Sequence, residues 1–230
     1  MHKGARLQAL LIDRKGTEMG RKTQITREMI LNAAYELLDE SGIGGVAIKQ
    51  IAAKLGCSTQ PVSWQFGSMS ELKKELYSYA SDKVFGGLEK DMQGRDAIEA
   101  FFLSGVRYLS IACDHPNVFR FLNVDDPLDT IGERIYGDNS IFSFQFDEEA
   151  VKIFASQYDV SAELFSEMVR DTVIYTHGLA LMMMFDGYKL PKEEACRMMY
   201  NLGTKLIKEL GITPGSDFET AFSSLSTLRD

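Results

Sequence analysis

The sequence predicts an all-α fold with a small N-terminal helix-turn-helix domain and a larger C-terminal helical domain. Apolar residues recur at helical spacing through most of the 230 residues, and no long segment alternates polar and apolar residues as a strand would. Gly42 and Gly56 end two early apolar repeats, and a short helix with a polar outer face follows. We place the divisions at a basic arm over 1–24, the helix-turn-helix domain over 25–70 with a fourth helix over 69–90 as connector, and a helical domain over 91–230.

The first helix is expected to begin near Thr26 and to end at Gly42. Its inward face has the i, i+4, i+7, i+8 spacing of an amphipathic helix: Ile30, Ala34, Leu37 and Leu38. A second helix with similar spacing ends at Gly56. Ser58 can cap a third helix, and Pro61 is tolerated in its first turn.

The fourth helix is expected to begin at a capping box formed by Ser68 and Glu71. A second capping box, Ser216 with Glu219, precedes the last helix. Between them the apolar spacing predicts helices at 95–113, 147–158, 161–185 and 191–210, with the last at 216–228. Residues 117–146 are less regular and rich in Phe.

Charge is distributed unevenly along the chain. Residues 1–74 contain 11 Lys and Arg against 7 Asp and Glu, a net of +4. Residues 75–230 contain 14 against 26, a net of −12, and the two sums give the total of −8. A basic N-terminal third on an acidic protein is expected where only that end meets phosphate, so the arm over 1–24 is either a DNA-tracking segment or an irregular start.

Other features favour a cytoplasmic protein. The longest apolar run, 179–185, falls short of the roughly 20 residues of a membrane span, and the N-terminus lacks a signal-peptide pattern. The three cysteines, Cys57, Cys113 and Cys196, are scattered and odd in number, which favours reduced thiols over disulfides or zinc. We therefore expect no metal, no cofactor and no membrane partner.

The third helix is the strongest candidate for a functional surface. Val62 and Phe66 lie four residues apart and point inward, which leaves a polar outer face. A plain structural helical hairpin has the same apolar pattern, but the polar face and the local basic charge favour DNA binding. Trp64 lies where the periodicity leaves a side chain exposed, although partial burial against the fourth helix is the commoner outcome for tryptophan.

These residues resemble the N-terminal domain of TetR-family transcriptional regulators over about residues 26–76. The resemblance rests on Ile30-Leu-x-Ala-Ala34, Leu37, Gly42, Ile51-Ala52, Gly56-Cys-Ser58, Val62-Ser-Trp-Gln-Phe66 and Leu72. A weaker likeness, Tyr175-Thr-His-Gly-Leu-Ala180, lies where that family dimerises. The resemblance implies a homodimeric transcription factor, more often a repressor, that binds near-palindromic double-stranded DNA and responds to a small apolar or aromatic effector.

The resemblance also implies roles for individual residues. Lys49 stands where the family often has a basic DNA contact, and Lys73, with Lys74 beside it, can add to it. The predicted DNA-binding residues of the third helix are Ser58, Thr59, Gln60 and Ser63 toward the major groove, with Trp64 and Gln65 against the phosphate backbone. The chain departs from the family pattern at Val46, Ala47, Ser63, Gln65 and Met69, and each departure removes a phosphate contact.

Two further surfaces are expected in the C-terminal domain. Large aromatic side chains can line an effector pocket, for which we expect Phe101, Phe102, Tyr108, Phe119, Phe121, Phe142, Phe165 and Met168. The late helices carry apolar residues on more than one face, so the expected dimer interface is Met168, Thr172, Tyr175, Leu179, Met182, Met198, Leu202 and Leu206, with single-chain core as the alternative. His177 is expected to be structural, because no second ligand lies at helical metal spacing.

Two alternatives remain open at this point. The spacing of Asp125, Asp126 and Asp129 is that of Mg²⁺–diphosphate sites in helical prenyl-transfer enzymes, but Pro127 interrupts it and no second motif follows. We therefore predict no catalytic residues and no enzymatic activity. The second alternative is a helical ligand- or partner-binding protein with weakened DNA binding.

Overall fold

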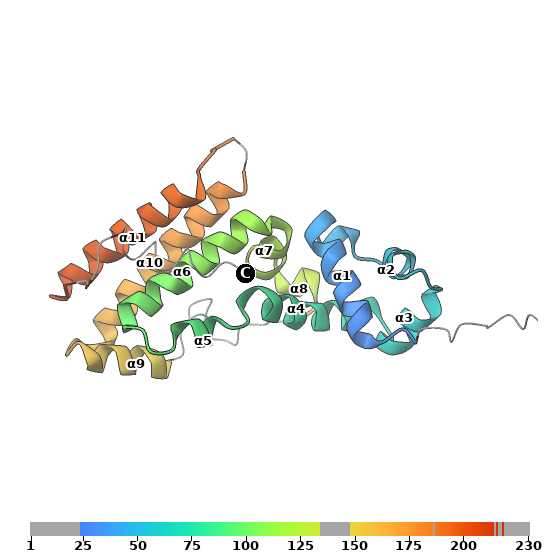
Figure 1. The fold of residues 1–230 in the computed structure, drawn as a ribbon, viewed down its shortest axis with the longest axis horizontal. Helices are drawn as coiled ribbons and strands as arrows, with labels where there is room; N and C mark the ends of the chain where they lie inside the picture. The colour runs from blue at the N-terminus through green and yellow to red at the C-terminus, as the bar shows by residue number, and fades with distance from the viewer. Residues whose placement is uncertain (1–23, 134–147, 186, 214, 216–217, 219–230) are drawn as a thin grey trace, which may run out of the picture.

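The computed structural model describes residues 24–133, 148–185, 187–213, 215 and 218, and this part of the chain contains helices and no strand (Figure 1). Three predicted features fall outside the described residues: the basic arm apart from Gln24, Phe142, and the helix at 216–228 apart from Phe218. The helices are α1 (Arg27–Ser41), the 3-10 turn η1 (Ile43–Gly45), α2 (Ile48–Lys54), α3 (Thr59–Phe66), α4 (Met69–Phe85), α5 (Leu88–Met92), α6 (Ala97–Asp114), α7 (Pro116–Asn123), α8 (Pro127–Thr130), α9 (Glu148–Gln157), α10 (Ala162–Met183) and α11 (Lys192–Glu209).

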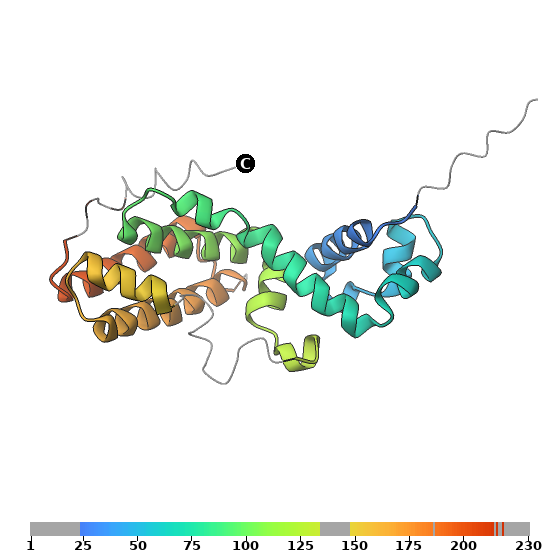
Figure 2. The ribbon, with the colours of Figure 1, turned by 90° about the horizontal axis from the view of Figure 1, so that it is seen from below.

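Helices α1, α2 and α3, together with the first half of α4 over 69–76, form a head at one end of the molecule (Figure 2). The head begins at Thr26, whose Oγ1 accepts a hydrogen bond from the Met29 amide at 3.2 Å, as an N-cap does. The buried side chains that the first three helices contribute to the head include Ile30, Ala34, Leu38, Ile51, Val62 and Phe66. The predicted inward faces of the first three helices are therefore confirmed.

Helix α4 connects the head to the rest of the molecule (Figure 2). Ser68 caps it, since Oγ accepts from the Glu71 amide at 3.2 Å. The predicted extent of 69–90 was wrong, because α4 ends at Phe85 and the chain turns at Gly86 and Gly87 before α5. A Cβ at Gly86 would lie 2.1 Å from the Asp82 carbonyl oxygen, so this turn requires a glycine.

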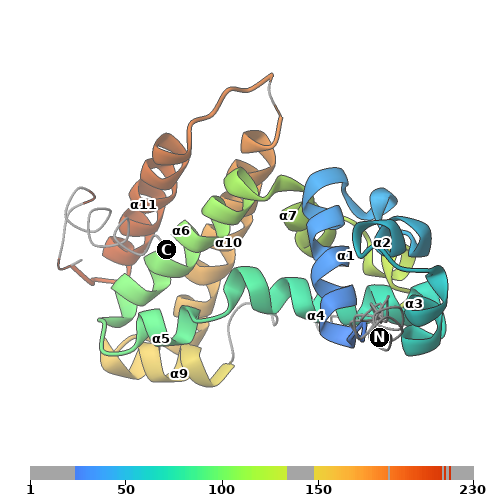
Figure 3. The same ribbon diagram turned by 45° about the vertical axis from the view of Figure 1, so that its right-hand side comes forward.

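The body is built around α6, α10 and α11, which lie side by side (Figure 3). Close packing of α6 against α11 depends on Gly203, where a Cβ would lie 2.7 Å from the Phe102 ring. The Phe102 ring in turn packs against Tyr200, with the centroids 4.6 Å apart. None of the described helices is long and apolar enough to cross a membrane.

Part of the segment that the sequence analysis treated as irregular folds as helix α7. Pro116 occupies its first turn, and four of its eight residues are buried: Val118, Phe119, Phe121 and Leu122. The helix contacts the head directly, because Asn117 Nδ2 donates to the Asp39 carbonyl of α1 at 2.8 Å. His115 Nδ1 lies 3.0 Å from the Asp39 carboxylate at the same joint.

Candidate nucleic-acid interface

The outer face of α3 is exposed and polar. Ser58, Thr59, Gln60 and Ser63 are all exposed, while Val62 and Phe66 anchor the opposite face in the head. Ser58 occupies the N-cap position but its side chain makes no capping hydrogen bond, so its hydroxyl stays available. The structure thus brings four of the predicted DNA-binding residues onto one surface.

Trp64 corrects one expectation, since it is 84% exposed and is not tucked against α4. Val62 and Phe66, on either side of Trp64 in the sequence, are the residues of α3 that are buried. A single exposed apolar side chain is common on protein surfaces, but this ring follows Ser63 directly in α3 and adds an aromatic surface next to the polar residues.

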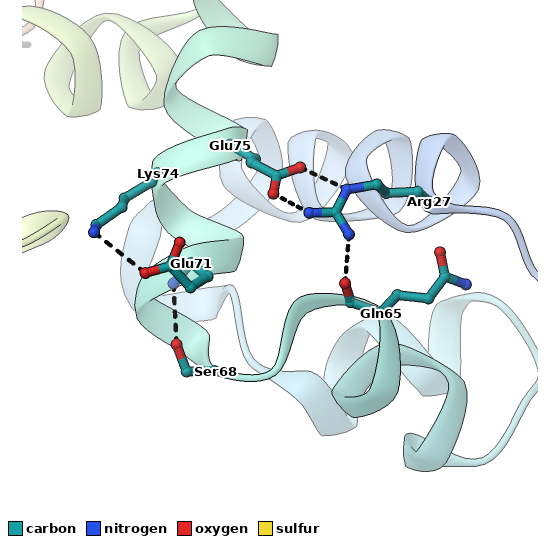
Figure 4. A network of polar contacts seen from close by, with 6 residues as sticks. All are labelled: Arg27, Gln65, Ser68, Glu71, Lys74 and Glu75. Atoms are coloured by element: carbon teal, nitrogen blue, oxygen red, sulfur yellow. Dashed lines mark hydrogen bonds and ion pairs between the residues drawn. The ribbon is translucent and has the colours of Figure 1, made fainter.

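Gln65, predicted to lie against the phosphate backbone, makes two contacts within the head. Its Nε2 donates to the Ile25 carbonyl at 2.7 Å, and its own carbonyl accepts from Arg27 Nη1 (Figure 4). Gln65 therefore fastens the end of α3 to the segment that precedes α1, and this contact uses one of the two N–H donors of its side-chain amide. The chain enters the head at Ile25, beside the end of α3.

Arg27 holds the helices of the head together, a structural role that the sequence analysis missed. Its Nε donates to Glu75 Oε2 at 2.7 Å and its Nη2 contacts the other carboxylate oxygen (Figure 4). The guanidinium also lies over the Phe66 ring, 4.1 Å from its centroid. One arginine thus joins α1, α3 and α4. Arg27 and Glu75 are 48 residues apart in the sequence, and no local pattern predicts that they pair.

Most of the head's positive charge is neutralised internally. Lys54 Nζ lies 2.8 Å from Glu40 and 3.0 Å from Glu36, and these hydrogen bonds raise the Lys54 pKa. Lys74 Nζ lies 2.6 Å from Glu133 and 3.2 Å from Glu71, which raises the Lys74 pKa for the same reason. The suggested contribution of Lys74 to DNA binding is therefore weakened in this conformation.

Two lysines of the head have no carboxylate partner among the described residues. Lys49 is exposed on α2, and Lys73 is half-buried on α4. Both are predicted DNA contacts. The departures at Val46, Ala47 and Met69 have structural roles instead: Val46 is 4% exposed, Ala47 precedes α2, and Met69 opens α4 and packs against the core.

The body contains a cavity of about 250 Å³ between α4, α5, α6, α10 and α11. Its lining residues are Ser81, Phe85, Leu88, Phe101, Ser104, Gly105, Tyr108, Thr172, Val173, Thr176 and Met199. Phe101 and Tyr108 were predicted to line it. The prediction was wrong for Phe102, Phe119, Phe121, Phe165 and Met168, which are buried in the core and do not line the cavity.

The predicted dimer interface needs a similar correction. Met168, Thr172 and Leu179 are at most 4% exposed within a single chain, so they pack inside the body. Tyr175, Met198, Leu202 and Leu206 are partly exposed, and Met182 is 38% exposed. The predicted α10 residues came from two faces of this helix, because both faces are apolar. The exposed face also carries Ile174, whose side chain is 53% exposed.

The acidic motif near α8 does not form a metal site. Asp126 caps α8, with Oδ1 accepting from the Leu128 amide at 2.9 Å, and Asp125 accepts from Arg120 Nε at 3.1 Å. No group of three or more His, Cys, Asp or Glu side chains that could hold a metal occurs in the described residues. The rival interpretation of 125–129 as a Mg²⁺–diphosphate site therefore loses its geometric basis.

The comparisons with known proteins agree with this geometry. Residues 30–76 match the family model described as "Bacterial regulatory proteins, tetR family". A search of curated proteins finds no significant sequence match.

Solved structures with the same fold include regulators from two bacterial genera. A TetR-like transcriptional regulator from Rhodococcus sp. RHA1 is 17% identical, with a TM-score of 0.54 over 76% of this chain and 92% of that one. A second transcriptional regulator from Rhodococcus sp. Rha1 is 15% identical, with a TM-score of 0.57 over 83% and 100%. A TetR variant from Acinetobacter baumannii AYE in complex with minocycline is 14% identical, with a TM-score of 0.54 over 82% and 99%.

The two findings cover different parts of the chain. The family model covers the head and the first part of α4, and the structural likeness extends over most of the chain. Residues 30–76 thus match the N-terminal domain of the TetR family, and the chain as a whole has the fold of these solved regulators.

Proposed function

We propose that this protein is a homodimeric transcriptional repressor that binds a near-palindromic operator through α3 and is released when a small molecule occupies the cavity. The observation that carries the proposal is the outer face of α3, where four polar side chains and an 84% exposed tryptophan face solvent on a TetR-family domain.

The chemistry of this face suits the major groove. The Gln60 amide can pair with adenine N6 and N7, and the hydroxyls of Thr59 and Ser63 can donate to or accept from base edges. Lys49 can neutralise a phosphate and release counterions, which gives affinity without sequence preference. One eight-residue helix meets only a few base pairs, so specificity requires two copies placed about 34–36 Å apart, or a multiple of that distance.

The exposed face of α10 supports association with a second copy. Ile174, Gly178 and Met182 are four residues apart along this helix and all three are exposed. Apart from the backbone of α10 itself and the two adjacent residues, no described atom lies within 4 Å of a Cβ placed at Gly178, so packing among the described residues does not require this glycine. A mid-helix glycine costs roughly 0.5–1 kcal/mol relative to alanine, and close approach of a partner helix would account for it.

Two connections between cavity and head support effector control. Ser81 and Phe85 line the cavity from α4, while Leu72 and Leu76 of the same helix are buried at its head end. Because α4 is continuous between these points, a ligand that displaces its C-terminal end changes the position of the head. Such a change alters the spacing of the two α3 helices in the dimer and thus the affinity for DNA.

A second connection runs through α7. Tyr108, which lines the cavity, packs against Phe119 with the ring centroids 4.9 Å apart. Two residues of the same helix segment, His115 and Asn117, hold Asp39 of α1. Cavity and head are therefore in contact through α7 as well as through α4.

The test separates base reading from phosphate contact. Binding of wild type, Gln60→Ala and Lys49→Ala is measured on an operator selected from random duplexes and on unrelated DNA, with Lys90→Ala on α5 as the matched control. We expect Gln60→Ala to reduce the preference for operator, and Lys49→Ala to weaken both DNAs equally. If both variants lost the same affinity on operator and on unrelated DNA, the assignment of base reading to Gln60 and phosphate contact to Lys49 would be contradicted.

The charge pairing near α3 supports a second candidate function, a ligand-binding protein with weakened DNA binding. The head pairs Lys54 and Lys74 internally and lacks the family's polar residues at Val46 and Ala47. A protein that binds small molecules in its cavity but shows no salt-sensitive shift of any duplex would be a ligand-binding module with weakened DNA binding.

A further inference from the structure

None of the described residues that line the cavity of the body carries a charged side chain. Its walls are apolar or aromatic, apart from five hydroxyl-bearing residues: Ser81, Ser104, Tyr108, Thr172 and Thr176. A buried ion needs a counter-charge or several hydrogen bonds, and moving it out of water without them costs several kcal/mol. The lining offers neither a cation for an anionic ligand nor a carboxylate for a cationic one.

Three of the hydroxyl groups in the walls already donate their protons to backbone carbonyls. Thr172 Oγ1 donates to the Met168 carbonyl at 2.9 Å, and Thr176 Oγ1 donates to the Thr172 carbonyl at 2.7 Å. Ser104 Oγ donates to the Phe101 carbonyl at 2.7 Å. Each hydroxyl has one proton and two acceptor lone pairs, so these three groups retain accepting capacity only.

The Tyr108 hydroxyl also has a hydrogen-bond partner within the chain. Its hydroxyl lies 2.7 Å from His177 Nδ1, and burial lowers the pKa of His177, which favours the neutral ring. With the proton of that ring on Nε2, the Tyr108 hydroxyl donates to Nδ1 and its oxygen can still accept. Ser81 has no hydrogen-bond partner among the described residues and can donate or accept.

We propose that the cavity takes a neutral molecule with an apolar or aromatic body and at least one hydroxyl or N–H donor, and that Thr176 is one of the acceptors for it. A bare hydrocarbon would offer no donor to the accepting lone pairs of the threonine and serine hydroxyls. A carboxylate would face several lone pairs with one available donor, and an ammonium would find aromatic faces but no carboxylate. The inference rests on the proposed function only in taking this cavity as the effector site.

The proposal is tested by ligand binding without DNA. Three aromatic skeletons, benzene, naphthalene and biphenyl, are each supplied as the hydrocarbon, the hydroxyl, the carboxylate and the methylammonium derivative. Binding to the full chain is measured by calorimetry and by the shift in unfolding temperature. We expect the hydroxyl derivative of at least one skeleton to bind more tightly than its hydrocarbon, and the charged derivatives to bind more weakly than both.

The variants locate the contact. Thr176→Val removes the hydroxyl with little change of shape, and the loss of one hydrogen bond of about 0.5–1.5 kcal/mol corresponds to roughly 2- to 13-fold weaker binding of the hydroxyl derivative. Binding of the hydrocarbon should be unchanged. Thr130→Val on α8 is the matched control, because its Oγ1 makes the same kind of bond to a carbonyl four residues earlier. Ser104→Ala provides a second variant if Thr176→Val does not fold.

Three results would overturn the proposal: a carboxylate or ammonium derivative that binds as tightly as its hydroxyl, equal effects of the valine substitution on hydroxyl and hydrocarbon, or no binding by any compound at millimolar concentration. DNA binding by the same preparation is measured separately. A protein that binds its operator but fails these ligand tests loses only the inference about the ligand, whereas one that binds ligands but no DNA loses the proposed function.

Discussion

Substitution of Lys49 tests the electrostatic part of DNA binding quantitatively. Lys49 and Lys73 are the head lysines without a carboxylate partner in the described residues, so a dimer presents four such cations. With a slope of about −0.9 per phosphate neutralised, these four predict a slope of log K against log salt of about −3.6. Affinity would then fall about 12-fold when the salt concentration doubles.

The basic arm over 1–24 is expected to make the salt dependence of binding steeper. Residues 1–22 contain six further Lys and Arg, and the chain enters the head beside α3. The full chain should therefore show a steeper slope than a chain lacking residues 1–22, which should approach about −3.6. In both backgrounds Lys49→Ala removes two cations from the dimer and should flatten the slope by about 1.8.

The assay is fluorescence anisotropy of a labelled operator duplex, titrated at several salt concentrations between about 0.1 and 0.3 M. Lys90→Ala serves as the control, because Lys90 is exposed on α5 in the body. An unchanged slope in Lys49→Ala, in both backgrounds, would refute the placement of this lysine against phosphate.

Three further predictions follow from single residues. Gly178→Ala should raise the free energy of unfolding of dilute monomer by about 0.5–1 kcal/mol yet weaken the dimer at least about tenfold in sedimentation; a strengthened dimer would exclude close helix approach at this position. His177 has a folded-state pKa below its usual 6.5, so the unfolded state binds more protons and stability should fall as the pH drops below about 7; His177→Gln should remove that part of the pH dependence in chemical denaturation, and an identical profile would contradict it. Asn117→Ala removes the hydrogen bond to the Asp39 carbonyl and should reduce the effect of a cavity ligand on DNA affinity while leaving ligand affinity unchanged; unaltered coupling would show that α4 alone transmits the signal.

Local patterns were sufficient to predict the head. The caps at Thr26 and Ser68 and the inward faces of α1 to α3 follow from short-range spacing, and the structure confirms them. The family resemblance depends on the same short-range motifs, and the family model matches the same region.

The remaining features depend on contacts between distant residues. The Phe-rich segment after Pro116 has no clear periodicity over its whole length, but its first seven residues fold as part of α7, where the helix packs against both the head and the body. On α10 both faces are apolar, and only the packing against α6 and α11 decides that Thr172 faces inward and Ile174 outward. The tethering of Gln65 to Ile25 spans 40 residues and has no local signature.

The central claim is that a pair of α3 helices reads DNA, and selection of bound duplexes from a random library tests it most directly. The account predicts enrichment of a near-palindrome bound by two chains, with half-sites about 34–36 Å apart or a multiple of that distance. Emission from Trp64, the single tryptophan of the chain, should change on binding. Recovery of no preferred sequence, or of an asymmetric site bound by one chain with unchanged tryptophan emission, would contradict the account.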